Sequence, residues 1–467
     1  MVKIRMKYDS LSVVFWNAKP YIKKGIFTLP LLYASFILLF CTINVLSLLY
    51  FDIAYLLMKN FVLFFNLILI IRSYRNNGIL SIYSLFISFC LFFLYARIFF
   101  DLIGYRPLTY YNFGKRITWN ENVIYQFLHY SFIFLIAIDF SYYISKPKKI
   151  ANKKFIENKS SKRVTYFFFF FFLLIFSYKC YLDIQAIHSM GYTAIISEIR
   201  INYPFWTKAS GTLFYISFYM LLMHKLSKKE TIIIFFLYAI VSALSGLKGA
   251  RAAFFLPIVF SLFYLSKKQY IKITISKLTM LVCLAIVFIF LITFSRGESL
   301  DHIKSFKDIF YYVFYNQTQT FNLPIFYLEH KHFCQENRSI PYIFSDTLHI
   351  YNSFFSTGSN VIHKFTGLPN GMGLGESLFL ELLDLHFIYS IIFCLYIGYI
   401  IKFVECNFFR NRTLLPIFCC FVSSAFYMPR NTMFSFLDSS SVIYFIATNF
   451  IILILTNFIY YSYFRKS

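Results

Sequence analysis

Apolar residues in this chain form long continuous runs that short polar segments separate, with no sustained alternating pattern. The runs have roughly the 20 residues that an α-helix needs to cross a hydrocarbon core of about 30 Å. The pattern therefore predicts an all-α polytopic membrane protein with about twelve transmembrane helices. We expect spans at residues 28–50, 53–71, 79–103, 122–145, 164–186, 210–225, 231–246, 252–266, 278–295, 379–401, 413–428 and 438–462.

The segment Arg296–Leu378, between the ninth and tenth predicted spans, is much longer than the other connections. Loops of this length are usually functional or disordered, and the many Tyr and Phe residues in this one argue against disorder. We expect short amphipathic helices here, lying over the bundle. The expected organisation is an N-terminal bundle over 1–295, a loop over 296–378 and C-terminal helices over 379–467.

Composition and charge support a membrane protein and exclude a soluble enzyme. Hydrophobic residues make up 59% of the chain and charged residues only 14%, whereas soluble domains have about 25% charged residues. The net charge of +25 is interpreted as a topology signal rather than as a nucleic-acid surface, because Lys and Arg collect in cytoplasmic segments. Their distribution predicts cytoplasmic N- and C-termini and a long loop outside the cytoplasm. We expect a bacterial inner (plasma) membrane location.

Several basic residues nevertheless fall in segments that this topology places outside the cytoplasm. They are Arg200, Lys248, Arg251, Arg296 and Arg430. Any single one can be explained as a side chain reaching toward lipid headgroups. Together they favour an anion site, because the guanidinium fork donates two parallel hydrogen bonds to a phosphate. We therefore predict that these residues bind a diphosphate.

A glycine-rich stretch ends the long loop and leads to acidic residues. Glu376 lies within it and Glu381 follows, at the expected outer end of the next span. A carboxylate beside an apolar wall can serve as a general base, and a carboxylate at a helix start is the structural alternative. Glu381 and Glu376 are our candidate catalytic residues, with His349 as a third.

Two charged residues lie inside the third predicted span. Arg97 and Asp101 are four residues apart, so they share one helix face and can pair. Charges within a membrane usually face the bundle interior or a water-filled cavity. We treat the two residues as candidates for lining a substrate cavity, with a purely structural ion pair as the alternative.

No nucleotide-binding or metal-binding signature occurs along the chain. Glu329, His330 and His332 form a small cluster, but their spacing is not a metal pattern, and we interpret them as solvated loop residues. Neither a metal nor another cofactor is expected. The nine cysteines lie mostly inside apolar runs, so no disulfide framework is predicted.

The whole arrangement resembles the Wzy-type O-antigen, or oligosaccharide repeat-unit, polymerases. Beside the many spans and the long outer loop, the resemblance rests on Ser245–Arg251, Phe294–Glu298, Gly371–Glu381 and Met428–Asn431. Where the family pattern has a Gly shortly after the Glu, this chain has Asp384, Leu385 and His386.

The resemblance implies a glycosyltransferase that polymerises undecaprenyl-diphosphate-linked repeat units at the periplasmic face, in contact with membrane lipid and without nucleic acid. With it, we expect Arg251, Arg296 and Arg430 to bind the diphosphate, with Lys248 and Arg200 as second choices. We expect Glu381 or Glu376 to be the base, with His349 behind them. The resemblance also implies a Wzz-type chain-length regulator as a partner. An O-antigen ligase that transfers glycan to lipid A–core, and a flippase for the same lipid, remain alternatives.

Overall fold

The structure is a computed structural model in which some segments of the chain are not described. It describes residues 28–104, 108–112, 115–151, 159–190, 204, 207, 209–247, 251–273, 275–295, 305, 308–309, 320–337, 341–342 and 377–430. The chain divides into two compact units, Met1–Phe65 and Asn66–Ser467. The candidate site lies in the second unit.

The first unit contains α2 (Thr28–Ser47) and the start of α3 (Phe51–Asn77). Aromatic rings join the two helices, because the Phe36 ring lies 6.0 Å from Phe61 and 5.0 Å from Phe65. Much of the apolar surface of α2 is exposed, with Leu31 and Leu38 each 70% accessible. Such a surface is expected for a helix that lipid surrounds.

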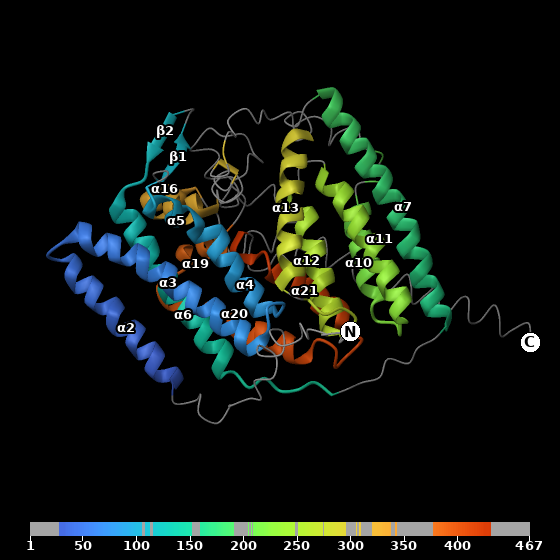
Figure 1. The fold of residues 1–467 in the computed structure, drawn as a ribbon, viewed down its shortest axis with the longest axis horizontal. Helices are drawn as coiled ribbons and strands as arrows, with labels where there is room; N and C mark the ends of the chain where they lie inside the picture. The colour runs from blue at the N-terminus through green and yellow to red at the C-terminus, as the bar shows by residue number, and fades with distance from the viewer. Residues whose placement is uncertain are drawn as a thin grey trace, which may run out of the picture. The chain divides into compact units, whose positions relative to one another are not determined.

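The second unit continues α3 and adds the remaining elements (Figure 1). In chain order they are α4 (Ile82–Cys90), the π-helix η1 (Leu91–Tyr95), α5 (Ala96–Leu102), β1 (Thr109–Asn112), β2 (Lys115–Thr118), α6 (Glu121–Ile144), α7 (Lys159–Met190), α10 (Ser210–Leu221), α11 (Lys228–Leu247), α12 (Arg251–Lys267), α13 (Ile275–Ser295), α15 (Asn322–Glu329), α16 (Lys331–Glu336), α19 (Leu378–Asp384), α20 (Phe387–Asn407), α21 (Leu415–Ala425) and the 3₁₀ turn η5 (Met428–Arg430).

Seven helices within the described residues are long and apolar enough to cross a membrane. They are Pro30–Ser47, Phe51–Asn77, Ile82–Leu102, Glu121–Ile144, Ser160–Ile187, Lys228–Gly246 and Phe387–Asn407. The prediction of a polytopic helical membrane protein is thereby confirmed. The count of twelve spans, the placement of the long loop and the division into three regions remain predictions, and the expected span over 438–462 lies outside the described residues.

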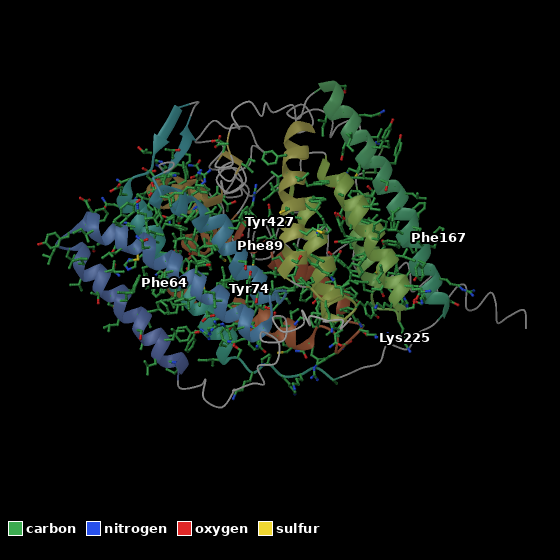
Figure 2. The ribbon with its side chains drawn as sticks, in the orientation of Figure 1. Phe64, Tyr74, Phe89, Phe167, Lys225 and Tyr427 are labelled. Carbon is green, nitrogen blue, oxygen red and sulfur yellow. The ribbon has the colours of Figure 1, made fainter. Side chains whose placement is uncertain are left out.

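Two groups of helices make up most of the second unit. In one, α6 packs along α20. The backbones approach closely at Gly398, where an added Cβ would lie 2.9 Å from Ser141 Cβ. In the other, α7, α10, α11, α12 and α13 are neighbours (Figure 1). Stacked rings fill their interior, such as Phe218 on Tyr238 at 3.9 Å. Phe167 points outward from α7 and is 63% exposed (Figure 2).

Three local features differ from the sequence prediction. The span expected at 379–401 is two helices, α19 and α20, separated by extended backbone at Leu385 and His386. The span expected at 79–103 contains the π-helix η1. Residues after it form an antiparallel hairpin, in which Thr109 pairs with Thr118. A continuous apolar run predicts that a segment lies in an apolar environment, but it does not show where the helix breaks.

Candidate functional site

The short helix α19 carries Glu381, the first of the predicted catalytic residues. Ser377 caps the helix, because its hydroxyl accepts a hydrogen bond from the Phe379 amide at 3.3 Å. Every residue of α19 is buried, and Glu381 is only 1% exposed. Phe379 packs against Phe127 and Phe134 of α6, with ring distances of 6.5 and 6.2 Å. Protein therefore surrounds the Glu381 carboxylate, which is not at the exposed end of a long span.

The turn η5, which carries Arg430, packs against α19. The Ser377 hydroxyl that caps α19 also donates a hydrogen bond to the Pro429 carbonyl at 3.4 Å. One side chain therefore holds the start of the Glu381 helix beside the Arg430 turn. Two predicted site residues that are far apart in the sequence thus lie on contacting elements. We call α15, α19 and η5 together the α19 layer.

Aromatic rings lie beneath the Arg430 guanidinium. Its Cζ is 5.4 Å from the centre of the Phe93 ring and 6.0 Å from that of Tyr427. These two rings meet edge to face at 5.4 Å, and Phe93 continues to Phe89 at 5.7 Å. Figure 2 labels the two ends of this row, Phe89 and Tyr427. Because Phe93 belongs to the π-helix η1, the wide turn helps to support Arg430; such turns are frequent at functional sites.

Asp384, at the end of α19, has a structural contact. Its Oδ2 accepts a hydrogen bond from the Tyr342 amide at 2.9 Å, and the Tyr342 hydroxyl donates to the Cys334 carbonyl at 3.1 Å. The Ser390 hydroxyl of α20 donates to the Leu382 carbonyl at 2.6 Å. Asp384 therefore connects the long segment before α19 to that helix.

Arg97 lies on α5 and is 1% exposed. Its Nη1 donates hydrogen bonds to the Thr109 carbonyl at 3.3 Å and to Asn322 Oδ1 at 3.2 Å. Asp101 is near the end of the same helix and is only partly buried. These contacts join Arg97 to the β-hairpin and to α15. Its pairing with Asp101, and a cavity lined by both residues, remain predictions.

Of the other predicted site residues, the structure describes only Arg251. Arg251 is the first residue of α12. Helices α11 and α12 approach closely near this residue, since a Cβ added to Gly246 would lie 2.7 Å from Phe254 Cβ. The remaining candidates lie outside the described residues; they are Arg200, Lys248, Arg296, His349 and Glu376.

The small cluster of Glu329 and two histidines lies at the end of α15 and the start of α16. His330 Nε2 is 3.9 Å from Glu329 Oε2, and His332 is exposed. Burial raises the pKa of the Glu329 carboxyl and lowers the pKa of the His330 imidazole, so it favours the neutral form of both. Among the described residues, no group of three His, Cys, Asp or Glu is arranged to hold a metal ion.

A second polar cluster lies toward the Ile144 end of α6, and the sequence analysis missed most of it. Asp139 is fully buried and accepts from Arg72 Nη1 at 2.9 Å and from the Tyr83 hydroxyl at 2.5 Å. Glu405 of α20 accepts from the Tyr142 hydroxyl and from the Tyr83 amide. The rings of Tyr83 and Tyr142 stack at 4.0 Å. We call these five residues the Asp139 network.

Sequence reasoning also missed Ser377, Asn322 and Trp119, whose hydrogen bonds organise the α19 layer. A signal for Asn322 existed, because it is a polar residue in an apolar stretch of the long loop. No comparable signal pointed to Ser377, since serine is frequent in loops of every kind.

Comparison with known proteins identifies the family. Searches of curated proteins and of solved structures gave no match. The family model described as O-antigen polysaccharide polymerase Wzy, by contrast, matches residues 31–463, which is most of the chain. The chain therefore belongs to the Wzy family, multi-pass glycosyltransferases of the inner membrane that polymerise lipid-linked repeat units.

Proposed function

We propose that the α19 layer is the site at which this polymerase transfers a growing glycan from its undecaprenyl-diphosphate carrier to a new lipid-linked repeat unit. The bond between the anomeric carbon of the donor and the diphosphate oxygen breaks. A bond forms between that carbon and a hydroxyl oxygen at the non-reducing end of the acceptor. The hydroxyl proton passes to a base, and the carrier leaves as its diphosphate.

The contact between α19 and η5 carries this proposal. A base and a cation are the two groups that the transfer requires, and Glu381 and Arg430 supply them on elements that Ser377 holds together. Glu381 is the base in this account, because it is buried and its helix is fixed at both ends. Glu376 and His349 are the alternative bases.

Arg430 in this account stabilises the charge that develops on the leaving diphosphate. A guanidinium in a site with little water stabilises such charge well, because it is placed before the reaction begins. The Arg430 guanidinium carbon lies over the rings of Phe93 and Tyr427, and arginine can combine aromatic stacking with fork-like recognition of phosphate.

The remaining basic residues extend the diphosphate site in this proposal. Arg251 and Arg296 contact the diphosphates directly, and Lys248 and Arg200 assist them. Arg97 and Asp101 line the cavity that receives the glycan. The reaction takes place at the periplasmic face, with both termini of the chain cytoplasmic, and a Wzz-type regulator sets the chain length.

The test is the lipopolysaccharide ladder of a deletion strain that is complemented with variants. Arg430→Ala is expected to reduce polymerisation about a hundredfold or more, because it removes a group that stabilises the transition state. The ladder then collapses to core plus one repeat unit. Arg430→Lys is expected to restore only part of the ladder, since an ammonium lacks the planar fork.

Arg410→Ala is the matched control. Arg410 follows the far end of α20 and donates from Nε to the Cys406 carbonyl at 3.2 Å, so the control removes one positive charge away from the α19 layer. A full ladder from Arg410→Ala is expected. A full ladder from Arg430→Ala, in protein that inserts normally, would exclude Arg430 from the site. Full ladders from alanine at Arg251 and Arg296 as well would reject the diphosphate site.

A further inference from the structure

One carboxamide joins three parts of the chain that are separate in the sequence. Asn322 Oδ1 accepts a hydrogen bond from Arg97 Nη1 at 3.2 Å and another from the Trp119 indole nitrogen at 3.0 Å. Arg97 also donates to the Thr109 carbonyl. The contact therefore links α5, the β-hairpin and the first residue of α15.

Both hydrogen bonds are buried. Arg97 is 1% exposed, Trp119 4% and Asn322 5%. A carbonyl oxygen has two lone pairs, and two protein donors already occupy those of Asn322 Oδ1. The oxygen is therefore engaged by the protein itself, which favours a role in holding the structure over a role in contacting substrate.

Asn322 is the first residue of α15, and Phe321 is the N-cap residue before it. The Asn322 carboxamide therefore attaches the start of this helix to Arg97 and Trp119. Helix α15 packs against α6 and α19. Phe321 meets Phe127 edge to face at 5.6 Å, and Phe127 also contacts Phe379 of α19. A displacement of α15 would therefore also displace α19, the helix that carries Glu381.

We propose that Asn322 is a positioning residue for polymerisation, which holds α15 against α19 and so fixes the place of the Glu381 carboxylate. The inference rests on the proposed role of Glu381. Arg97 and Trp119 act in it as the two donors that hold the Asn322 carboxamide. Small displacements of a reacting group are sufficient to slow catalysis, since an error of 1 Å costs about a hundredfold.

The experiment measures polymerisation by the purified full-length protein with lipid-linked repeat units as substrate. Asn322→Leu keeps the size of the side chain and removes the acceptor. It is expected to lower kcat about tenfold to a hundredfold, with KM for the lipid-linked substrate within about twofold of wild type, because positioning affects the chemical step and not binding. Asn322→Asp keeps an acceptor for both donors and is expected to restore most of kcat.

Cys334 offers a second readout that does not depend on activity. It is buried in α16, directly after α15, and its carbonyl accepts from Tyr342. A membrane-impermeant maleimide, with mass spectrometry to locate the label, reports the exposure of this thiol. Labelling is expected to be slow in wild type and in Asn322→Asp, and faster in Asn322→Leu.

Several outcomes would overturn the inference. One is a wild-type kcat in Asn322→Leu, and another is a raised KM with unchanged kcat. A third is Asn322→Asp kinetics as poor as those of Asn322→Leu. If Asn322→Leu fails to insert, Trp119→Phe decides, because it removes one donor and keeps an aromatic ring. A lower kcat at unchanged KM is expected from it, and wild-type kinetics would reject the inference.

The Glu381→Gln variant separates this inference from the function on which it rests. Full activity in Glu381→Gln would reject the proposed base, whatever Asn322 does. An inactive Glu381→Gln together with a wild-type Asn322→Leu would reject the positioning role alone.

Discussion

The α19 layer and the Asp139 network lie toward opposite ends of α6, and they hold different kinds of structure together. The network joins side chains of four apolar helices, with Asp139 between Arg72 and Tyr83 and with Glu405 beside Tyr142. The α19 layer joins side chains to backbone in short elements and turns, as in the contact between Ser377 and the Pro429 carbonyl.

The difference separates two uses of buried polar groups. Charged residues within a membrane protein usually face the bundle interior and mark functional paths. In the Asp139 network each carboxylate meets hydroxyl, amide or guanidinium donors from neighbouring helices, which is the arrangement of a structural clamp. The α19 layer instead sets a carboxylate-bearing helix beside an arginine-bearing turn, which is the arrangement that our proposed group transfer uses.

The largest effect on folding is expected from Asp139→Ala. The Arg72 side chain is only 12% exposed, and removing one partner of a buried ion pair costs about 3–5 kcal/mol. We expect a large loss of folded protein, measured by thermal unfolding in detergent. The protein that does fold should polymerise at a normal specific rate.

The control for Asp139→Ala is Lys162→Ala rather than Glu230→Ala, because Glu230 also accepts a hydrogen bond from the Ser227 amide at the start of α11. Glu230 pairs with Lys162 at 3.2 Å, but the two side chains are 39% and 24% exposed. Pairs of this kind contribute less than about 1 kcal/mol, so the unfolding temperature should hardly change. Equal losses of stability from the two substitutions would contradict the description of the Asp139 network as a clamp.

A smaller effect is expected from Gly398→Ala. The added methyl group would meet the Ile138 carbonyl and lie 2.9 Å from the Tyr142 amide. Forcing α6 and α20 apart in this way should cost about 1–3 kcal/mol, with little change in the specific rate, since Gly398 lies away from α19. Gly211→Ala is the control, because the atoms nearest to its added methyl group belong to the Phe176 ring, at 3.1 Å and beyond. If Gly211→Ala unfolded at a temperature as low as Gly398→Ala, that result would argue against the close approach of α6 and α20.

The long apolar helices were predictable from the sequence. The run expected at 122–145 is α6, Glu121–Ile144, and the run expected at 231–246 is α11, Lys228–Leu247. Such runs are recognisable because each backbone polar group in lipid must be satisfied within the segment. Their length and composition therefore specify a helix with little help from the rest of the chain.

The short elements of the site were not predictable in the same way. The apolar run that contains Glu381 continues without Gly or Pro through Leu385 and His386, yet the helix stops there. The side chain of Asp384, the last residue of α19, accepts a hydrogen bond from the Tyr342 amide, and that contact comes from a distant part of the chain. The position of Arg430 beside α19 likewise depends on Ser377, and no local pattern encodes it.

The most direct measurement compares Glu381→Gln with Glu405→Gln, two equal changes to carboxylates in the two clusters. Polymerisation of lipid-linked repeat units and thermal unfolding are recorded for both purified proteins. We expect Glu381→Gln to lose about a hundredfold or more in rate and to keep its unfolding temperature. Glu405→Gln should unfold at a lower temperature and keep its rate. Near-normal polymerisation by Glu381→Gln, or an equal loss of rate in folded Glu405→Gln, would contradict the assignment of chemistry to the α19 layer.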